Sequence, residues 1–337
     1  MQAEILAKVI RGETVESSHR GHLIVVDGEG ETVAQIGNPE TVTFFRSSAK
    51  PFQTIPLLTS GAAERFGFSE KEIALACGSH SGESFHVETV REMLEKIGLS
   101  EADLQCGTHL PFEEKTARKM IKADEKPTQL HNNCSGKHCA MLGFAKHSSA
   151  NIKDYHLLEN PIQHKILETI SLFSDIPKDE IKIGIDGCAA PNFALPVSAM
   201  ARSYAKLVFP PEEFDEKMRE ACRTIVSAMT NYPEMIGGNE RLDTILMQET
   251  NGKIISKVGA GGVYTAGVLP SAKWKTGLGI AFKIEDGEDK RARPVVAVEL
   301  LRQFGILDAQ SLKNLSPLMI ENRRGDIVGK VVASFSI

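Results

Sequence analysis

The sequence predicts an α+β fold, in which an antiparallel sheet flanked by helices carries an inserted helical region. Three observations predict it: apolar and polar residues alternate near both ends of the chain, the middle has apolar residues at helical spacing, and strands and helices are segregated rather than strictly alternating. We therefore expect a single unit spanning residues 1–337, with a sheet subdomain from about 1–60 and 250–337 and a mainly helical subdomain from about 61–249.

The N-terminal part is expected to form an antiparallel meander. Residues 5–18, 22–36 and 41–45 carry β-branched side chains at a period of two, and Asp27–Gly30 supplies a turn between two strands. This part accounts for one edge of the predicted sheet.

The middle of the chain changes to a helical period. Apolar residues recur at helical spacing in residues 86–98, with Gly98 as the expected stop. The other stretches of helical character are residues 113–124, 159–173, 192–207 and 210–230, the last of which starts with proline and acidic residues.

Strand patterns return near the C-terminus. They cover residues 253–259, 262–269, 277–287 and 326–337, and one helix is expected over residues 293–305. A sheet built from both chain ends is the simplest arrangement of these elements.

Composition narrows the classes of function. The 337 residues suffice for a large core, and 42% hydrophobic with 25% charged residues is typical of a soluble globular protein. A net charge of −5, without a basic block, argues against nucleic acid as a partner. We see no signal peptide and no apolar run long enough to cross a membrane, so we expect a cytoplasmic protein with six reduced cysteines.

Ser47 and Lys50 form the first candidate for chemistry. A serine hydroxyl needs a base to remove its proton, and a lysine can serve if burial lowers its pKa. A spacing of three residues at a helix start places both on one face, beside N–H groups that stabilise an oxyanion. Chance is the alternative, because the same spacing recurs at Ser203 and Lys206 within a helical stretch.

Two further segments resemble the other motifs of Ser-Lys enzymes. Ser79 lies in a turn-rich segment, residues 77–84, where its hydroxyl could relay a proton; a capping loop for the next helix is the alternative. Lys257 lies before a glycine-rich turn, as the third motif requires, although Lys275 also opens a Lys-Thr-Gly sequence.

Cysteines and polar residues also indicate a metal site. The segment 131–142 contains Cys134, with His131 and His138 close by, and the segment 184–193 contains Asp186 and Cys188. The two loops could converge on a zinc ion, with the histidines as the first choice of nitrogen ligand. Buried thiols without a metal are the alternative.

Together, these segments resemble the rhizobial-type (class 3) L-asparaginases, also called the asparaginase II family. The resemblance is carried in order by FFRSSAKPFQ, CGSHSGE, HNNCSGKHCAML, IGIDGCAAPNFALP, KVGAGGV and GLGIAFKIEDG. It implies a fold similar to serine β-lactamases and penicillin-binding proteins, a homodimer, and hydrolysis of L-asparagine to L-aspartate and ammonia through a serine acyl-enzyme. The ordered set leads us to reject chance for Ser47.

The resemblance also implies roles for individual residues. Ser47 pairs with Lys50, and Ser79 pairs with Lys257, as the catalytic groups. A zinc site is implied at Cys134, Lys137 and Cys188, where Lys137 would bind as a neutral amine. The residues expected to contact the substrate are Arg46, His80 and Asp186.

One position departs from the family pattern. Gly261 stands where we expect a glutamate in the glycine-rich turn, so the details of the substrate pocket are left open. Two other functions are kept as alternatives: a zinc- or thiol-dependent amidase that uses Cys134 or Cys188, and a non-catalytic binder of small amides or metal.

Overall fold

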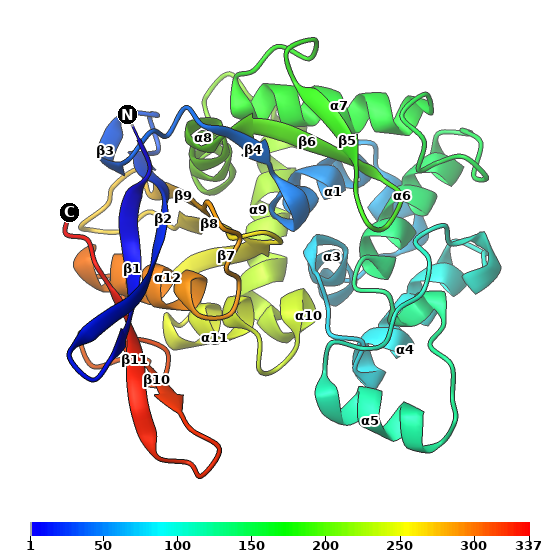
Figure 1. The fold of residues 1–337 in the computed structure, drawn as a ribbon. Helices are drawn as coiled ribbons and strands as arrows, with labels where there is room; N and C mark the ends of the chain where they lie inside the picture. The colour runs from blue at the N-terminus through cyan, green and yellow to red at the C-terminus, as the bar shows by residue number, and fades with distance from the viewer. Residues whose placement is uncertain (1) are drawn as a thin grey trace. The chain divides into compact units, whose positions relative to one another are not determined.

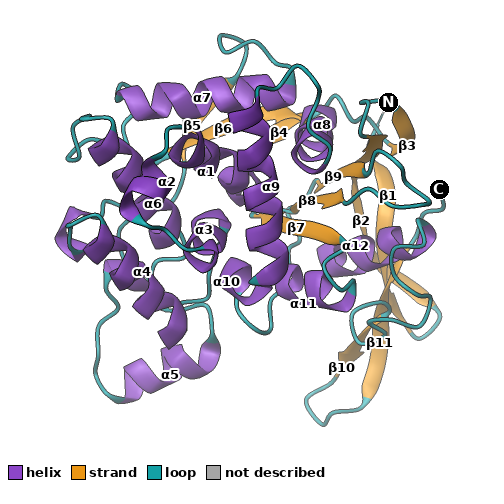
Figure 2. Cartoon of the chain, turned by 180° about the vertical axis from the view of Figure 1, so that it is seen from behind, coloured by secondary structure: helices purple, strands orange, loops and turns teal. Residues whose placement is uncertain are grey.

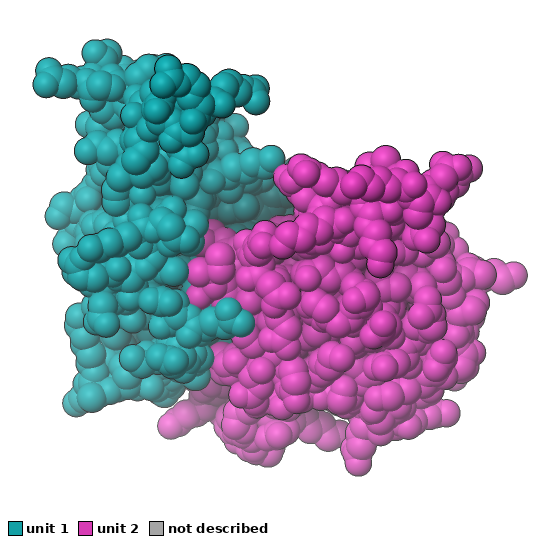
Figure 3. Space-filling view, turned by 90° about the horizontal axis from the view of Figure 1, so that it is seen from below, with its two compact units in different colours: residues 1–48, 195–209, 246–337 teal, residues 49–194, 210–245 magenta. Residues whose placement is uncertain are grey.

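The computed structural model describes residues 2–337, and the chain divides into two compact units (Figure 3). Unit 1 consists of residues 1–48, 195–209 and 246–337, and unit 2 consists of residues 49–194 and 210–245. Within the described part of the chain, no helix combines the length and the apolar character that a bilayer crossing requires.

Unit 1 is built on an antiparallel sheet of eight strands, counted over residues 2–337, in the order β10-β11-β1-β2-β9-β8-β7, with β3 paired to β2. The strands are β1 (Glu4–Arg11), β2 (Thr14–Asp27), β3 (Thr32–Ile36), β7 (Ile254–Gly259), β8 (Val263–Val268), β9 (Leu278–Ile284), β10 (Leu318–Glu321) and β11 (Ile327–Ala333). The short strand β4 (Val42–Phe44) follows β3.

The two ends of the chain meet in this sheet. β1 pairs with β11 in a register that sets Val9 opposite Val331 (Figure 1). Because the first and last strands are neighbours, the sheet is complete only when both ends of the chain are in place.

Helices α8 (Val197–Val208) and α12 (Ala292–Gln303) pack on the sheet of unit 1 (Figure 2). Gly267 and Gly279 lie opposite each other on β8 and β9, and a Cβ at Gly279 would come within 2.0 Å of the Ala201 carbonyl oxygen. These two glycines therefore let α8 approach the strands closely. Every residue of β7 and β8 is buried, so both faces of the sheet are covered there.

Unit 2 is mainly helical. Its helices are α1 (Lys50–Thr59), α2 (Ala62–Phe66), α3 (Glu70–Cys77), α4 (Ser84–Lys96), α5 (Glu114–Lys122), α6 (Ser135–His147), α7 (Pro161–Ser174), α9 (Glu216–Asn231) and α10 (Pro233–Gly237). Helix α1 contacts α3, α6, α7 and α9, and α6 is buried on all sides from Ser135 to Ala145. A hairpin of β5 (Lys182–Ile185) and β6 (Pro191–Pro196) completes the unit, and α11 (Leu242–Glu249) holds the crossover to unit 1.

The predicted α+β class, with a sheet from both chain ends and an inserted helical region, is confirmed. Two details of the prediction were wrong. Residues 192–207 are not one helix, because residues up to Pro196 extend β6 and α8 begins only at Val197. Helix α9 begins at Glu216 and not near Pro210, because the Asp215 side chain accepts a hydrogen bond from the Met218 N–H and so caps the helix.

Candidate active site

Lys50 is the first residue of helix α1, and a 3₁₀ turn, Arg46–Ala49, precedes it. Pro51 falls in the first helical turn, where its missing N–H costs no hydrogen bond. Arg46 adopts a left-handed conformation with φ of 55°, which ends the extended segment that contains β4. Ser47 therefore lies immediately before a helix start, as the sequence predicts.

The Lys50 amine is enclosed by oxygen acceptors of unit 2. Its side chain is 1% exposed, and Nζ donates to the Gly78 carbonyl at 2.6 Å, the Ser79 Oγ at 2.9 Å and the Asn133 carbonyl at 3.2 Å. Burial is the largest cause that lowers the pKa of Lys50; the sulfur of Cys134 opposes this shift and the charge of Lys137 adds to it. Burial therefore makes Lys50 easier to deprotonate than an exposed lysine, while the three oxygen acceptors match the three donors of its protonated form.

Ser79 lies in the loop that follows α3, and it is held from two sides. Its backbone N–H donates to the Ile236 carbonyl at 2.7 Å, while its hydroxyl meets Lys50. The next helix, α4, has Glu83 at its N-cap position and receives no side-chain capping bond, either from Glu83 or from the serines of this loop. The loop therefore positions a hydroxyl at an amine instead of capping α4.

His80 joins this loop to the start of α6. Nδ1 accepts the Gly82 N–H at 3.2 Å, so the neutral ring carries its proton on Nε2 and donates it to the Ser135 Oγ at 2.8 Å. The ring is fully buried, and burial, with His86 and Lys50 nearby, keeps its pKa well below the usual range. This geometry gives His80 a positioning role, and contact with a substrate stays a prediction.

In unit 1, the segment that contains Ser47 lies beside β7, the strand that contains Lys257. The Ser48 Oγ donates to the Lys257 carbonyl at 2.9 Å, and Tyr204 donates to the Ser48 carbonyl at 2.9 Å. A Cβ at Gly259 would lie 2.9 Å from the Phe45 carbonyl oxygen, so the two backbones are in close contact. Residues 47 and 257, distant in sequence, are thus carried by adjoining segments.

The structure places the two members of each predicted pair in different units. Ser79, which the resemblance pairs with Lys257, is hydrogen-bonded to Lys50 within unit 2. Ser47 and Lys257 belong to unit 1, while Lys50 and Ser79 belong to unit 2. The pairs Ser47–Lys50 and Ser79–Lys257 therefore stay predictions, as does the contact of Arg46 with a substrate.

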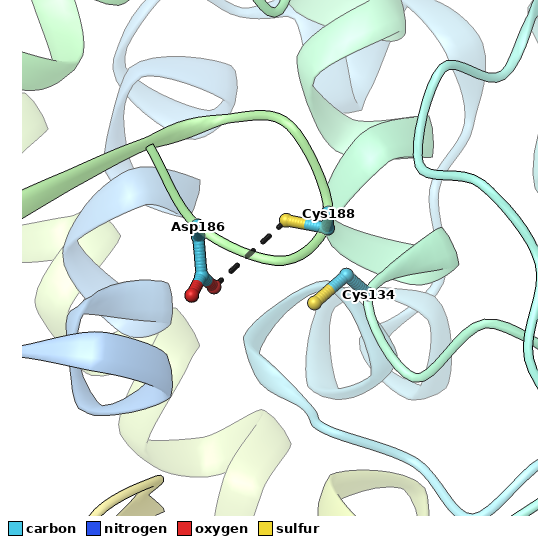
Figure 4. A group of neighbouring side chains, drawn as sticks. All are labelled: Cys134, Asp186 and Cys188. Atoms are coloured by element: carbon cyan, nitrogen blue, oxygen red, sulfur yellow. Dashed lines mark hydrogen bonds between the residues drawn. The ribbon is translucent and has the colours of Figure 1, made fainter. Parts of the chain in front are cut away.

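A second cluster of unit 2 brings together the loops expected to bind a metal. Cys134 is the residue before α6, and Asp186 and Cys188 lie in the turn of the β5–β6 hairpin. The two sulfurs and a carboxylate oxygen all lie within 4.8 Å of one another (Figure 4). Lys137, one turn into α6, reaches the same place, with Nζ 3.1 Å from the Cys188 Sγ.

The pKa values of Cys134, Lys137 and Cys188 depend on one another. A hydrogen bond from Cys134 and the charge of Lys137 lower the pKa of Cys188, although burial opposes this. The bond to Cys188, together with burial, raises the pKa of Cys134. Burial disfavours the charge on Lys137, yet the sulfurs of Cys188 and Cys134 outweigh it and raise the pKa of Lys137. The directions of these shifts favour a thiolate at Cys188, a thiol at Cys134 and an ammonium at Lys137.

The donor set of this cluster fits a zinc ion. Two sulfurs, an amine nitrogen and a nearby carboxylate are ligands that tetrahedral zinc accepts. The three residues that would supply the sulfurs and the nitrogen, Cys134, Lys137 and Cys188, are each only 3% exposed. Of the two histidines in the segment, His131 is engaged elsewhere, because its Nδ1 accepts the Thr128 N–H at 3.1 Å. His138 belongs to the cluster: its Nδ1 lies 2.6 Å from the Tyr155 hydroxyl, and its ring interacts with Cys188, whose pKa it helps to lower. No pattern in the sequence indicates Tyr155 as a partner of His138.

Comparisons with known proteins give the family. The chain matches the family L-asparaginase II over residues 7–333. No curated protein matches it significantly.

Several solved structures resemble the chain distantly. A probable glutaminase from Bacillus subtilis, complexed with 6-diazo-5-oxo-L-norleucine, is 13% identical with a TM-score of 0.39 over 88% of each chain. A Bacillus glutaminase in 4.3 M NaCl is 14% identical with a TM-score of 0.40, covering 86% of this chain and 92% of its own. At these values the similarities carry no argument about the activity.

The family match covers nearly the whole chain and includes every candidate residue named above. The protein therefore belongs to the L-asparaginase II family, a family of amidohydrolases.

Proposed function

We propose that the protein hydrolyses L-asparagine to L-aspartate and ammonia, with Ser47 as the nucleophile and Lys50 as its base. The observation that supports this most strongly is the buried Lys50 amine, whose pKa is lowered by burial at the start of a helix three residues after Ser47. A buried lysine with a lowered pKa loses its proton more easily than an exposed one, and the neutral amine is the base that a serine nucleophile needs.

The proposed reaction has two stages. Neutral Lys50 takes the proton of Ser47, and the Ser47 oxygen attacks the side-chain amide carbon of asparagine. Backbone N–H groups at the helix start stabilise the oxyanion that forms, and each donor lowers the activation barrier by about 3 kcal/mol. The carbon–nitrogen bond then breaks, and the proton reaches the departing ammonia through Ser79 and Lys257. Water hydrolyses the resulting ester, which releases aspartate and restores the Ser47 hydroxyl.

Zinc is proposed as the resident metal of the cysteine cluster. Cys134, Lys137 and Cys188 would hold it, and Asp186 lies beside them with an oxygen 4.0 Å from the Cys188 Sγ. When bound, zinc would supply a Lewis acid that orients the α-amino or α-carboxylate group of the substrate. Arg46, His80 and Asp186 are proposed to surround the substrate. A homodimer is proposed on the strength of the resemblance, and a cytoplasmic location on the sequence pattern of the N-terminus and the sparse cysteines.

The test is ammonia release from asparagine and from glutamine. Ser47→Ala should lower kcat on asparagine by roughly 10³-fold or more, since it removes the nucleophile. Ser203→Ala is the matched control, because Ser203 is part of the same Ser-x-x-Lys spacing but donates to the Ala199 carbonyl inside α8. Full activity in Ser47→Ala would end the assignment.

A second candidate is a thiol-dependent amidase, which the lowered pKa of Cys188 favours. Mass spectrometry after treatment with an electrophilic asparagine analogue separates the two. A label on Ser47 supports the serine mechanism, a label on Cys188 supports the thiol mechanism, and an unlabelled protein that still binds asparagine would be a non-catalytic binder.

A further inference from the structure

The turn between β7 and β8 is held by side chains that take no part in the proposed chemistry. Gly261 and Gly262 both adopt left-handed conformations, with φ of 76° and 77°, which aim their N–H groups at one carboxylate. The Asp289 oxygens accept these bonds, at 3.1 Å from Gly261 and 2.7 Å from Gly262. Lys283 donates to the Gly261 carbonyl at 2.5 Å. Side chains therefore bond both N–H groups of the turn and the Gly261 carbonyl.

Arg293 holds the strand ends on either side of this turn. Its guanidinium, in the first turn of α12, donates to the Gly259 carbonyl at 2.7 Å and to the Val263 carbonyl at 3.5 Å. It also pairs with Asp289 at 2.5 Å, while Arg293 as a residue is 8% exposed. We call Asp289 and Arg293 the turn clamp.

The turn clamp exceeds what a hairpin requires. The turn between β2 and β3 is held by one carboxylate, Asp27, which accepts bonds from the Glu29 and Glu31 N–H groups at 3.0 Å each, and by the Thr276 hydroxyl, which accepts the Gly28 N–H at 3.2 Å; no buried arginine is bonded to it in the described residues. Burying a guanidinium is costly unless its bonds are satisfied in good geometry. The β7–β8 turn is therefore fixed more firmly than another turn of the same unit.

The clamp reaches the proposed nucleophile through direct backbone contact. A Cβ at Gly259, the residue that Arg293 holds, would lie 2.9 Å from the Phe45 carbonyl oxygen, so the two backbones lie close together. The carbonyl of Lys257, two residues earlier, accepts a hydrogen bond from the Ser48 hydroxyl at 2.9 Å. Ser47 lies between these two contacts in the sequence. The end of β7 therefore adjoins the segment 45–48 on both sides of Ser47.

We propose that Asp289 and Arg293 are positioning residues: they fix the end of β7 against the segment 45–48 and so orient Ser47 and Lys257. This inference rests on the proposed role of Ser47. Because a misplacement of about 1 Å can cost about 100-fold in rate, loss of the clamp is expected to lower kcat much more than it changes KM.

The experiment compares Asp289→Asn with Asp27→Asn, and Arg293→Met with Arg302→Met, in the full-length enzyme. Asp27 is a matched carboxylate of a hairpin turn, and Arg302 is a matched arginine from the last turn of α12, where it donates to the Ser316 carbonyl at 2.9 Å. We expect kcat to fall roughly 10- to 100-fold in the clamp variants with KM within about threefold, and to fall less than about threefold in the controls. Hydrogen exchange followed by mass spectrometry should show faster exchange over residues 45–48 and 257–263 in the clamp variants alone.

Equal kcat in clamp and control variants overturns the proposal, as does unchanged exchange over residues 45–48. If Arg293→Met does not fold, Asp289→Asn and the conservative Asp289→Glu decide: Asp289→Glu should recover part of the lost kcat, and no difference between these two variants and the wild type counts against the clamp. Ser47→Ala in the same series separates the two ideas. Its full activity would refute the proposed nucleophile, while the exchange data would still show whether the clamp reaches residues 45–48.

Discussion

At the scale of single residues, the buried Lys50 determines the expected pH dependence. Activity needs the neutral amine, so kcat/KM should rise with pH through a pKa below the ordinary lysine value of about 10.4. Lys50→Arg keeps the charge at every accessible pH and should be inactive throughout. A pH–rate profile checks this, and a Lys50→Arg enzyme with the wild-type profile would contradict it.

The same shift links stability to pH. The folded state releases the Lys50 proton at a lower pH than the unfolded state does, so between the two pKa values the unfolded state binds more protons and stability rises with pH. As pH falls through the folded pKa, this contribution is lost. Urea midpoints of the wild type and of Lys50→Met should diverge in that window, with the wild type gaining relative stability as pH rises; parallel curves would show that Lys50 does not titrate there.

The cysteine cluster makes a prediction about protons. With a thiol at Cys134, a thiolate at Cys188 and an ammonium at Lys137, binding of zinc by three deprotonated ligands should release about two protons. Lys137→Met should reduce the release to about one. Calorimetric titration with zinc in two buffers of different ionisation enthalpy measures this number, and the absence of binding would remove zinc from the proposal.

At the scale of elements, the packing of α6 on α3 can be tested with two glycines of one helix. A Cβ at Gly136 would lie 2.6 Å from the Leu75 carbonyl oxygen, whereas the nearest atom to a Cβ at Gly143 would be 3.4 Å away. Gly136→Ala should destabilise the protein by about 1–3 kcal/mol through overpacking. Gly143→Ala should be neutral or stabilise by up to about 1 kcal/mol, because alanine favours a helix. Urea unfolding compares them, and equal effects would contradict the close approach.

Elements were predictable where their signal is local. The alternation of β1 and β2, the helical period of α4 and the proline-tolerant start of α1 follow from side chains within a few residues of one another. The start of α9 was misplaced because Pro210 and the acidic residues after it resemble a helix start, while the bond that caps the helix is made by Asp215.

At the scale of the whole molecule, unit 1 depends on both ends of the chain. Deleting residues 326–337 removes β11 and leaves β1 and β10 without their shared partner, so unit 1 should lose its fold. Deleting only residues 335–337 spares the ladder, including the bond from the Ser334 N–H to the Leu6 carbonyl, and should cost at most about 1 kcal/mol. Circular dichroism and limited proteolysis distinguish the two, and a folded 1–325 fragment would contradict the prediction.

The units themselves were only partly predictable. Residues 195–209, whose pattern reads as part of the helical middle, belong to unit 1, because α8 packs on Gly267 and Gly279 of the sheet. The two glycines allow a helix to pack closely on the sheet, but the local sequence does not indicate which helix it is. Membership of a unit is therefore a property of packing and not of local pattern.

The sequence by itself determined the α+β class, the meander at the N-terminus, and the chemical character of Ser47, Lys50, Ser79, Cys134 and Cys188. These follow from period and residue chemistry, which act over short distances along the chain. Only the tertiary structure decided that the Lys50 amine meets the Ser79 hydroxyl, that Cys134, Asp186 and Cys188 surround one point, and that Asp289 and Arg293 hold the end of β7. Such contacts join elements whose residues are 27 to 54 positions apart, and only the packing of these elements fixes which partner each buried polar group finds.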